Sequence, residues 1–128
     1  MKEVVIIISI LLIVFGSTML IQDYLNKGTD KLVGKLEEIK KEVEGKNIGE
    51  EELKKKSEII YKEWKEINES WSTIVLHEEI DSIETALIRM KSKIQIGNIE
   101  DSMEDIDTSI FLLKHIKEKE KTSLKNIF

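Results

Sequence analysis

An uncharged apolar run near the N-terminus limits what this chain can fold into more than any other feature. Residues 4–21 read VVIIISILLIVFGSTMLI, which is 18 residues without a charge. A helix of that length spans roughly 27 Å, close to the hydrocarbon thickness of a bilayer, about 30 Å. Asp23 ends the run, and Tyr24 lies where interfacial aromatic residues are common. We therefore expect residues 1–26 to form a membrane anchor, with the transmembrane part at 4–21.

The alternative for this run is a cleaved signal peptide. The apolar core of a signal peptide is usually shorter, about 7–15 residues. Gly16, Ser17 and Thr18 are small, but no A-x-A cleavage pattern is present, so we favour an uncleaved, single-pass anchor in the cell membrane. Lysines on both sides of the run leave its orientation open by the positive-inside rule. Because only three residues precede the span, we expect the C-terminal domain to be extracytoplasmic.

The rest of the chain has the composition of a helical protein. There is no proline, and 35% of the residues are charged, with both signs mixed and a net charge of −5. This composition gives strands little support, and it lacks the basic footprint of a nucleic-acid-binding protein. The absence of cysteine excludes a disulfide, a thiolate nucleophile and a cysteine-ligated metal.

Four apolar stripes follow a predicted linker at residues 27–29, and each has the spacing of one buried helix face. The predicted helix starts are Thr29 or Asp30, Asn47 with Glu50, and Asn98 with Asp101. The stripes are Leu32, Leu36, Ile39 and Val43; Leu53, Ile60, Trp64, Ile67, Trp71 and Ile74; Leu76, Ile80, Ile83, Leu87, Met90 and Ile94; and Ile99, Met103, Ile106, Ile110 and Leu113.

The phase of the apolar pattern jumps between Ile74 and Leu76, by about 200° on a helix with 3.6 residues per turn. A sharp bend near residues 72–77 would let the chain double back into a compact bundle. One long helix from Asn47 to Ile96 is the alternative, favoured by the absence of glycine and proline at the jump. We favour the bend. The predicted fold is all-α: an N-terminal transmembrane helix, then a small antiparallel bundle of three to four helices over residues 30–128.

One cluster of side chains has the residue types of a metal site. His77 and Asp81 are four residues apart and Glu84 follows, so the three share one helix face. His115 would lie at the same end of an antiparallel hairpin, and two histidines with two carboxylates suffice for a divalent metal such as zinc. The simpler interpretation pairs His77 with a carboxylate on a solvated surface and packs His115, half-buried, at a helix end.

No catalytic residue and no cofactor are expected. The sequence HEEID lacks the second histidine of the H-E-x-x-H pattern, and no glycine-rich phosphate loop is present. Serines near His77 have no sign of a nucleophile turn.

Other residues are candidates for binding a partner. Trp64 and Trp71 are one heptad apart; they are most simply core anchors, and the alternative is an exposed aromatic groove for a partner helix. The C-terminal sequence TSLKNIF ends on apolar residues, so we expect it to fold back onto the bundle or to dock into a partner. The partner-binding candidates are Trp64, Trp71, His77, Glu78 and Phe128.

Several short motifs together resemble a known family. They are the N-terminal span, Trp64, HEEID at 77–81, LLKHI at 112–116 and LKNIF at 124–128. The chain resembles a domain-of-unknown-function family of short, single-span, membrane-anchored helical proteins from Firmicutes such as clostridia. The resemblance implies a membrane-anchored helical domain without an established activity, and it marks His77, Glu78, His115 and the C-terminal tail as candidate positions.

These observations lead to one functional expectation and one alternative. We expect a membrane-anchored, non-enzymatic interaction module that binds another membrane or envelope protein, or a second copy of itself. The alternative is a ligand-sensing or metal-binding bundle that uses the metal candidates, which are His77, Asp81, Glu84 and His115.

Overall fold

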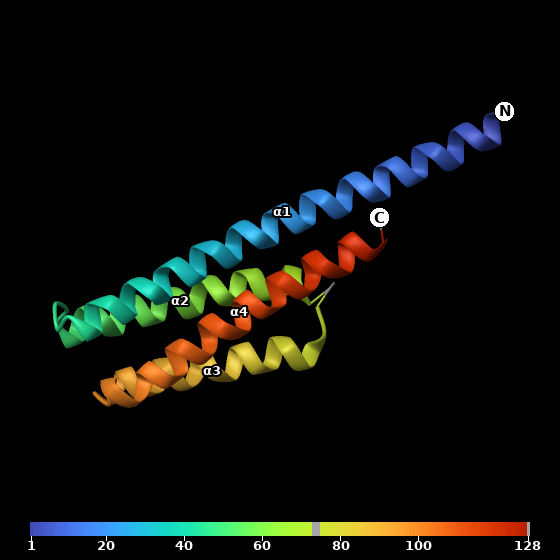
Figure 1. Cartoon of the computed structure of the whole chain (residues 1–128). Coiled ribbons are helices and arrows are strands. Elements are labelled where there is room, and N and C mark those ends of the chain that lie inside the picture. Colours follow the sequence, from blue (N-terminus) through green and yellow to red (C-terminus); the bar gives the residue numbers. More distant parts are fainter. Residues whose placement is uncertain (73–74, 128) are drawn as a thin grey trace.

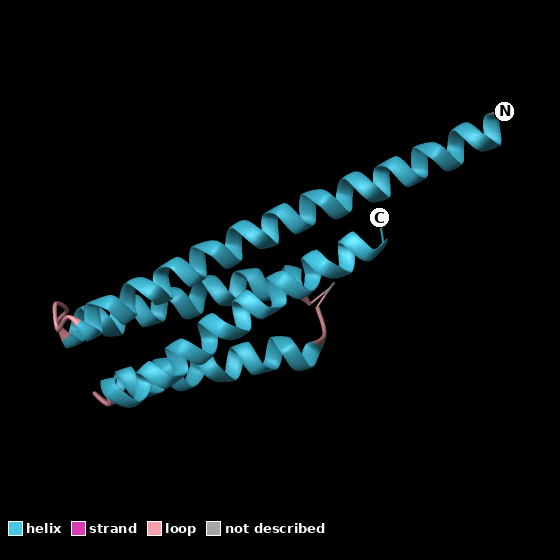
Figure 2. Cartoon of the chain, viewed as in Figure 1, coloured by secondary structure: helices cyan, strands magenta, loops and turns pink. Residues whose placement is uncertain are grey.

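The computed structural model describes residues 1–72 and 75–127, with the backbone alone for 120–127. All regular structure within these residues is helical (Figure 2). The helices are α1 (Lys2–Glu44), α2 (Glu50–Trp71), α3 (His77–Gln95) and α4 (Ile99–Ile127). The all-α prediction, with a long apolar N-terminal helix and a helical bundle, is therefore confirmed.

The four helices form an antiparallel bundle in which sequence neighbours are also neighbours in space. α1 packs against α2 and α4, and α3 packs against the same two helices. Figure 1 shows α1 extending far beyond the other helices on its N-terminal side. We call the end of the bundle where α1 enters, α2 ends and α3 begins the base, and the opposite end the far end.

The sharp bend predicted near residues 72–77 is confirmed, because α2 ends at Trp71 and α3 begins at His77. The prediction that the third apolar stripe begins at Leu76 is wrong. Leu76 has an extended backbone immediately before α3 and is 62% exposed, whereas Val75 is buried. Val75 therefore joins the core in the place expected for Leu76. Ile74 lies outside the described residues.

The helix break predicted at residues 27–29 is wrong, because α1 runs without interruption from Lys2 to Glu44. Thr29, expected to cap a helix, is instead buried within one. Glycine disfavours a helix by only about 1 kcal/mol, and packing against α2 overrides that preference at Gly28. A Cβ atom at Gly28 would lie 3.0 Å from Ile67 Cδ1. The division into an anchor at 1–26 and a domain at 30–128 stays a prediction.

The capping box of Asn47 with Glu50 is also wrong. The residue that precedes α2 is Gly49, which has no side chain that could cap the helix. Asn47 belongs to the end of α1 instead, since its N–H donates to Glu42 O at 3.0 Å. Lys46, just before it, has a left-handed φ of 53°. A left-handed residue followed by such a bond is a common way to close a helix.

The turn before α4 agrees with the helix start that was predicted at Asn98 and Asp101. Gly97 has a positive φ of 82°, a conformation that glycine adopts without strain. Asn98 Nδ2 donates to Asp101 Oδ2 at 2.7 Å, so the two predicted side chains do meet. Glu100 and Asp101 lie in the first turn of α4, where negative charge favours the helix dipole.

Two tryptophans of α2 anchor the core. Trp64 and Trp71 are 0% and 2% exposed, and their rings meet edge to face with centroids 5.8 Å apart. Aromatic pairs favour this geometry because the positive ring edge meets the negative face. Most predicted stripe residues are buried around them: Leu32, Leu36 and Ile39 of α1; Leu53, Ile60 and Ile67 of α2; Ile80, Ile83, Leu87, Met90 and Ile94 of α3; and Ile106 and Leu113 of α4.

Two glycines of α1 offer a matched test of this packing. A methyl group at Gly34 would meet no atom within 4 Å, whereas at Gly28 it would press on Ile67. Gly34→Ala should raise the free energy of unfolding by about 0.5–1 kcal/mol, because alanine favours the helix. Gly28→Ala should raise it less, because Ile67 must shift. Urea unfolding of the full chain in detergent micelles, followed by circular dichroism, measures both. An equal gain at the two positions would contradict the contact with Ile67.

Candidate functional site

The N-terminal half of α1 presents the largest exposed apolar surface of the described residues. It projects away from the bundle (Figure 1), and none of the residues in its most apolar 18-residue stretch is buried. By length and composition, α1 is able to cross a membrane. A continuous exposed apolar surface of this size needs a covering medium or partner, since water would leave it unstable.

The exposed surface gives way to the bundle core within a single helical turn. Ile21 is 42% exposed, whereas Leu25, four residues later, is 5% exposed. From there the buried stripe continues through Thr29, Leu32 and Leu36. α1 therefore carries two apolar surfaces in succession, one open and one covered by α2 and α4.

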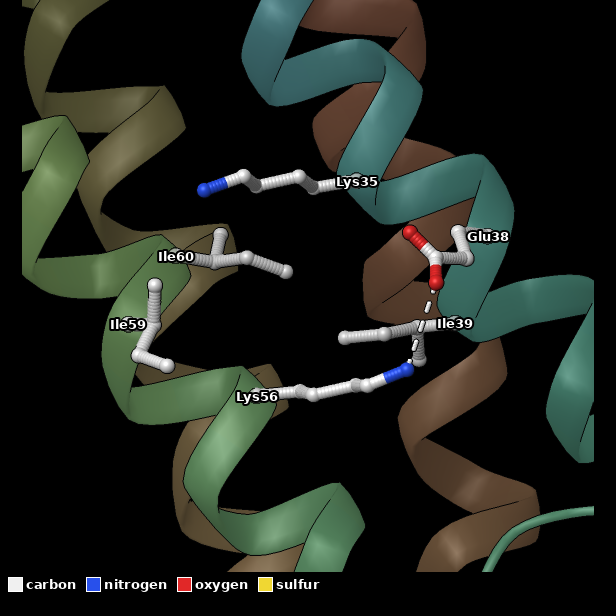
Figure 3. A pocket seen from close by; sticks show the side chains of 6 residues that line it. All are labelled: Lys35, Glu38, Ile39, Lys56, Ile59 and Ile60. Carbon is white, nitrogen blue, oxygen red and sulfur yellow. Dashed lines mark hydrogen bonds and ion pairs between the residues drawn. The ribbon is translucent and has the colours of Figure 1, made fainter.

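A small groove lies between α1 and α2 (Figure 3). Ile39 and Ile60 are buried beneath it, and Ile59 is half exposed at its rim. Its volume of about 200 Å³ is below the range of typical small-molecule sites, about 300–1,000 Å³. This groove is therefore smaller than a typical small-molecule or cofactor site.

The lysines that flank this groove are held by carboxylates of the bundle. Lys56 Nζ lies 2.7 Å from Glu42 Oε1 and 3.3 Å from Glu38 Oε1. The hydrogen bond to Glu42 raises the pKa of Lys56 above its ordinary value. Lys35 is ion-paired with Glu63 of α2. Both ammonium groups therefore join α1 to α2, and their charges are balanced within the bundle.

A second exposed surface, which the sequence patterns missed, lies on α2 and α3. We define the α2–α3 surface as Tyr61, Ile88, Lys91, Ser92, Gln95 and Ile96, which line one shallow depression. Ile88 and Ile96 are 44% and 78% exposed. Lys91 Nζ lies 4.9 Å from the centre of the Tyr61 ring, a cation–π distance. Both isoleucines lie outside the predicted core stripes, and this position in the sequence could have indicated an exposed apolar surface.

The four metal candidates do not come together. Among the described residues, no group of three or more His, Asp or Glu side chains could hold a metal ion. Lys119 Nζ lies 2.5 Å from Glu79 Oε1, so His77 is level with about residue 121 and His115 with about residue 83. The two histidines are therefore on the order of 9 Å apart along the bundle axis.

Each metal candidate also has a surface environment. His77 and Asp81 are exposed, and Glu84 is partly exposed. His115 is exposed and stacks on Phe111, with ring centroids 6.0 Å apart and planes 14° apart. The expectation that His115 is half-buried is therefore wrong, because the outer face of α4 is not covered by another helix at this level.

The partner-binding candidates fall into three groups. Trp64 and Trp71 lie in the core, so the interpretation as core anchors holds and no exposed tryptophan groove is formed. His77 and Glu78 are exposed in the first turn of α3, at the base of the bundle. Phe128 lies outside the described residues.

This arrangement predicts that divalent metals leave the fold unchanged. A zinc ion at a hundred times its dissociation constant would stabilise the folded chain by about 2.7 kcal/mol. We expect the thermal unfolding midpoint of the full chain in detergent to be the same with zinc and with chelator. A zinc-dependent rise that His77→Ala removes would contradict this, whereas a rise that survives His77→Ala would come from another part of the surface.

The chain was also compared with known proteins. Residues 19–127 match the Domain of unknown function (DUF4363). This match begins near the end of the exposed apolar stretch and includes the whole bundle. No curated protein and no solved structure matches the chain.

Proposed function

Because the chain belongs to the DUF4363 family of domains of unknown function, we propose its role from the structure. The proposed role is that of a membrane-anchored helical interaction module without enzymatic activity. Residues 4–21 of α1 span the membrane, the bundle stands on the extracytoplasmic side, and it binds another membrane or envelope protein or a second copy of itself.

One observation carries the proposal: the apolar half of α1 is exposed along its whole length. None of the residues in its most apolar 18-residue stretch is buried, yet α1 continues directly into the bundle core. A bilayer would cover this apolar surface on all sides and shield it from water without further protein. A core helix of a soluble protein would be largely buried, and this half of α1 is not.

The α2–α3 surface is the proposed contact with the partner. It combines exposed isoleucines with the aromatic ring of Tyr61 and the cation of Lys91. Apolar and aromatic centres with a polar rim are typical of protein interfaces. His77 and Glu78 extend the candidate contact towards the base, where another membrane protein would be near.

Photo-crosslinking in cells tests this contact. A photoreactive residue at Ile88 should capture one dominant membrane or envelope protein, or a second copy of the chain. The same residue at Gly34 is the control, because Gly34 is exposed on α1, a helix that does not pack against α3. Identification is by mass spectrometry. Equal capture from both positions, or none from position 88, would contradict the proposed contact.

Topology is tested separately with a single cysteine. The natural chain has none, so Gly34→Cys introduces one label site on exposed helix. A membrane-impermeant maleimide should label this cysteine in intact cells. A second variant, Lys2→Cys, should be labelled only after the membrane is opened. The reverse pattern would place the bundle in the cytoplasm.

A further inference from the structure

Ion pairs between α1 and α4 show how far α4 reaches towards the base. Lys40 Nζ pairs with Asp107 at 2.8 Å, and Lys117 Nζ pairs with Asp30 at 2.6 Å. The two residue numbers sum to 147 in both pairs and to 151 in a third pair, Lys114 with Glu37, as expected for antiparallel helices whose register varies by no more than about one turn. Ile127, ten residues after Lys117, is therefore level with about residues 20–24 of α1.

The last turns of α4 thus reach the level of α1 at which the exposed apolar half ends. The α4 backbone stays helical to Ile127. Figure 1 shows this end of α4 extending beyond the α2–α3 connection, towards the side on which α1 projects from the bundle. If residues 4–21 cross the membrane, residues 121–127 of α4 come to the depth where the span meets the headgroups.

Other described residues at the base have the character of a membrane interface. Tyr24 is 55% exposed directly after the span, and Leu76 is 62% exposed directly before α3. Aromatic residues concentrate at the headgroup level because their rings are apolar with one polar group. A bundle held away from the membrane by a flexible linker would not need these residues at its base, and α1 has no such linker.

The sequence of the α4 end matches the same environment. Residues 121–127 read KTSLKNI, with Leu124 and Ile127 three apart and Lys121 and Lys125 four apart. Residues three or four apart share a helix face, so the two apolar and the two basic residues fall on one side of the helix. Basic amphipathic helices lie in membrane interfaces, where lysines are attracted to anionic headgroups and apolar residues enter the acyl boundary.

We propose that the base of the bundle, with residues 121–127 of α4, lies in the same membrane interface that α1 enters and contacts anionic phospholipid headgroups. The chain then has two membrane contacts, the span and the end of α4. Two contacts fix the tilt of the bundle and the direction in which the α2–α3 surface points. This inference rests on the proposed function, because it needs α1 to cross the membrane.

Fluorescence depth measurements on the full chain test the proposal. Single cysteines replace Ser123 in the α4 end, four residues before Ile127 and therefore on its helix face, Ile96 at the far end and Gly16 in the span, where an added side chain meets no atom. Each carries an environment-sensitive fluorophore in vesicles of phosphatidylcholine and phosphatidylglycerol in equal amounts. Quenchers are a lipid nitroxide near the headgroup and iodide in the water.

The label at position 123 should have blue-shifted emission, strong quenching by the lipid nitroxide and protection from iodide. The label at position 96 should show none of these. Ile127→Glu should return the label at position 123 to water, because it places a charge on the face proposed to enter the acyl boundary. Vesicles of phosphatidylcholine alone should weaken the signal at 123, and an unchanged signal there would overturn the role of anionic headgroups.

The label at position 16 shows whether a negative result concerns the second membrane contact alone or the proposed anchor as well. If it is quenched by lipid while the label at 123 is as open to iodide as the label at 96, the second membrane contact is overturned and the anchor stands. If the label at 16 is itself exposed to water, the proposed anchor fails, and the inference about α4 fails with it.

Discussion

The unbroken backbone of α1 is the constraint on which the rest of the structure depends. A single helix of 43 residues carries an exposed apolar half and then the buried stripe that begins at Leu25. Because helical hydrogen bonds link each turn to the next, the two halves cannot rotate or separate freely. Any orientation that a membrane imposes on the first half is passed directly to the bundle, and Gly28 does not act as a hinge because α2 packs closely against it.

The core and the ion pairs have different roles in holding the other helices to α1. The buried residues around Trp64 and Trp71 supply the main stabilisation, since apolar burial is the largest favourable contribution to folding. Exposed ion pairs such as Lys117 with Asp30 contribute little to stability. They do favour one register, because a shift by one turn would separate the paired charges. Lys93 with Asp105 is more buried, and this hydrogen bond raises the pKa of Lys93.

The proposed function follows from where apolar surface is left uncovered. The bundle buries the predicted stripes and leaves open the N-terminal half of α1 and the α2–α3 surface. The first is continuous and uncharged, which suits lipid, whereas the second is small and mixed with lysine, which suits a protein. The metal candidates have no comparable support, because His77 and His115 lie at different levels of the α3–α4 pair.

The amino-acid sequence specifies which residues are apolar, how they repeat and where the pattern changes phase. That was enough for the helical class, the membrane-length run, the bend after Trp71 and most of the core, because burial of a 3.6-residue stripe depends mainly on local spacing. The remaining features depend on how the helices pack against one another. Gly28 stays helical because Ile67 covers it, Val75 rather than Leu76 enters the core because the chain turns there, and His115 is exposed because no helix lies over it. Each depends on a neighbour distant in the sequence, and local spacing carries no record of that neighbour.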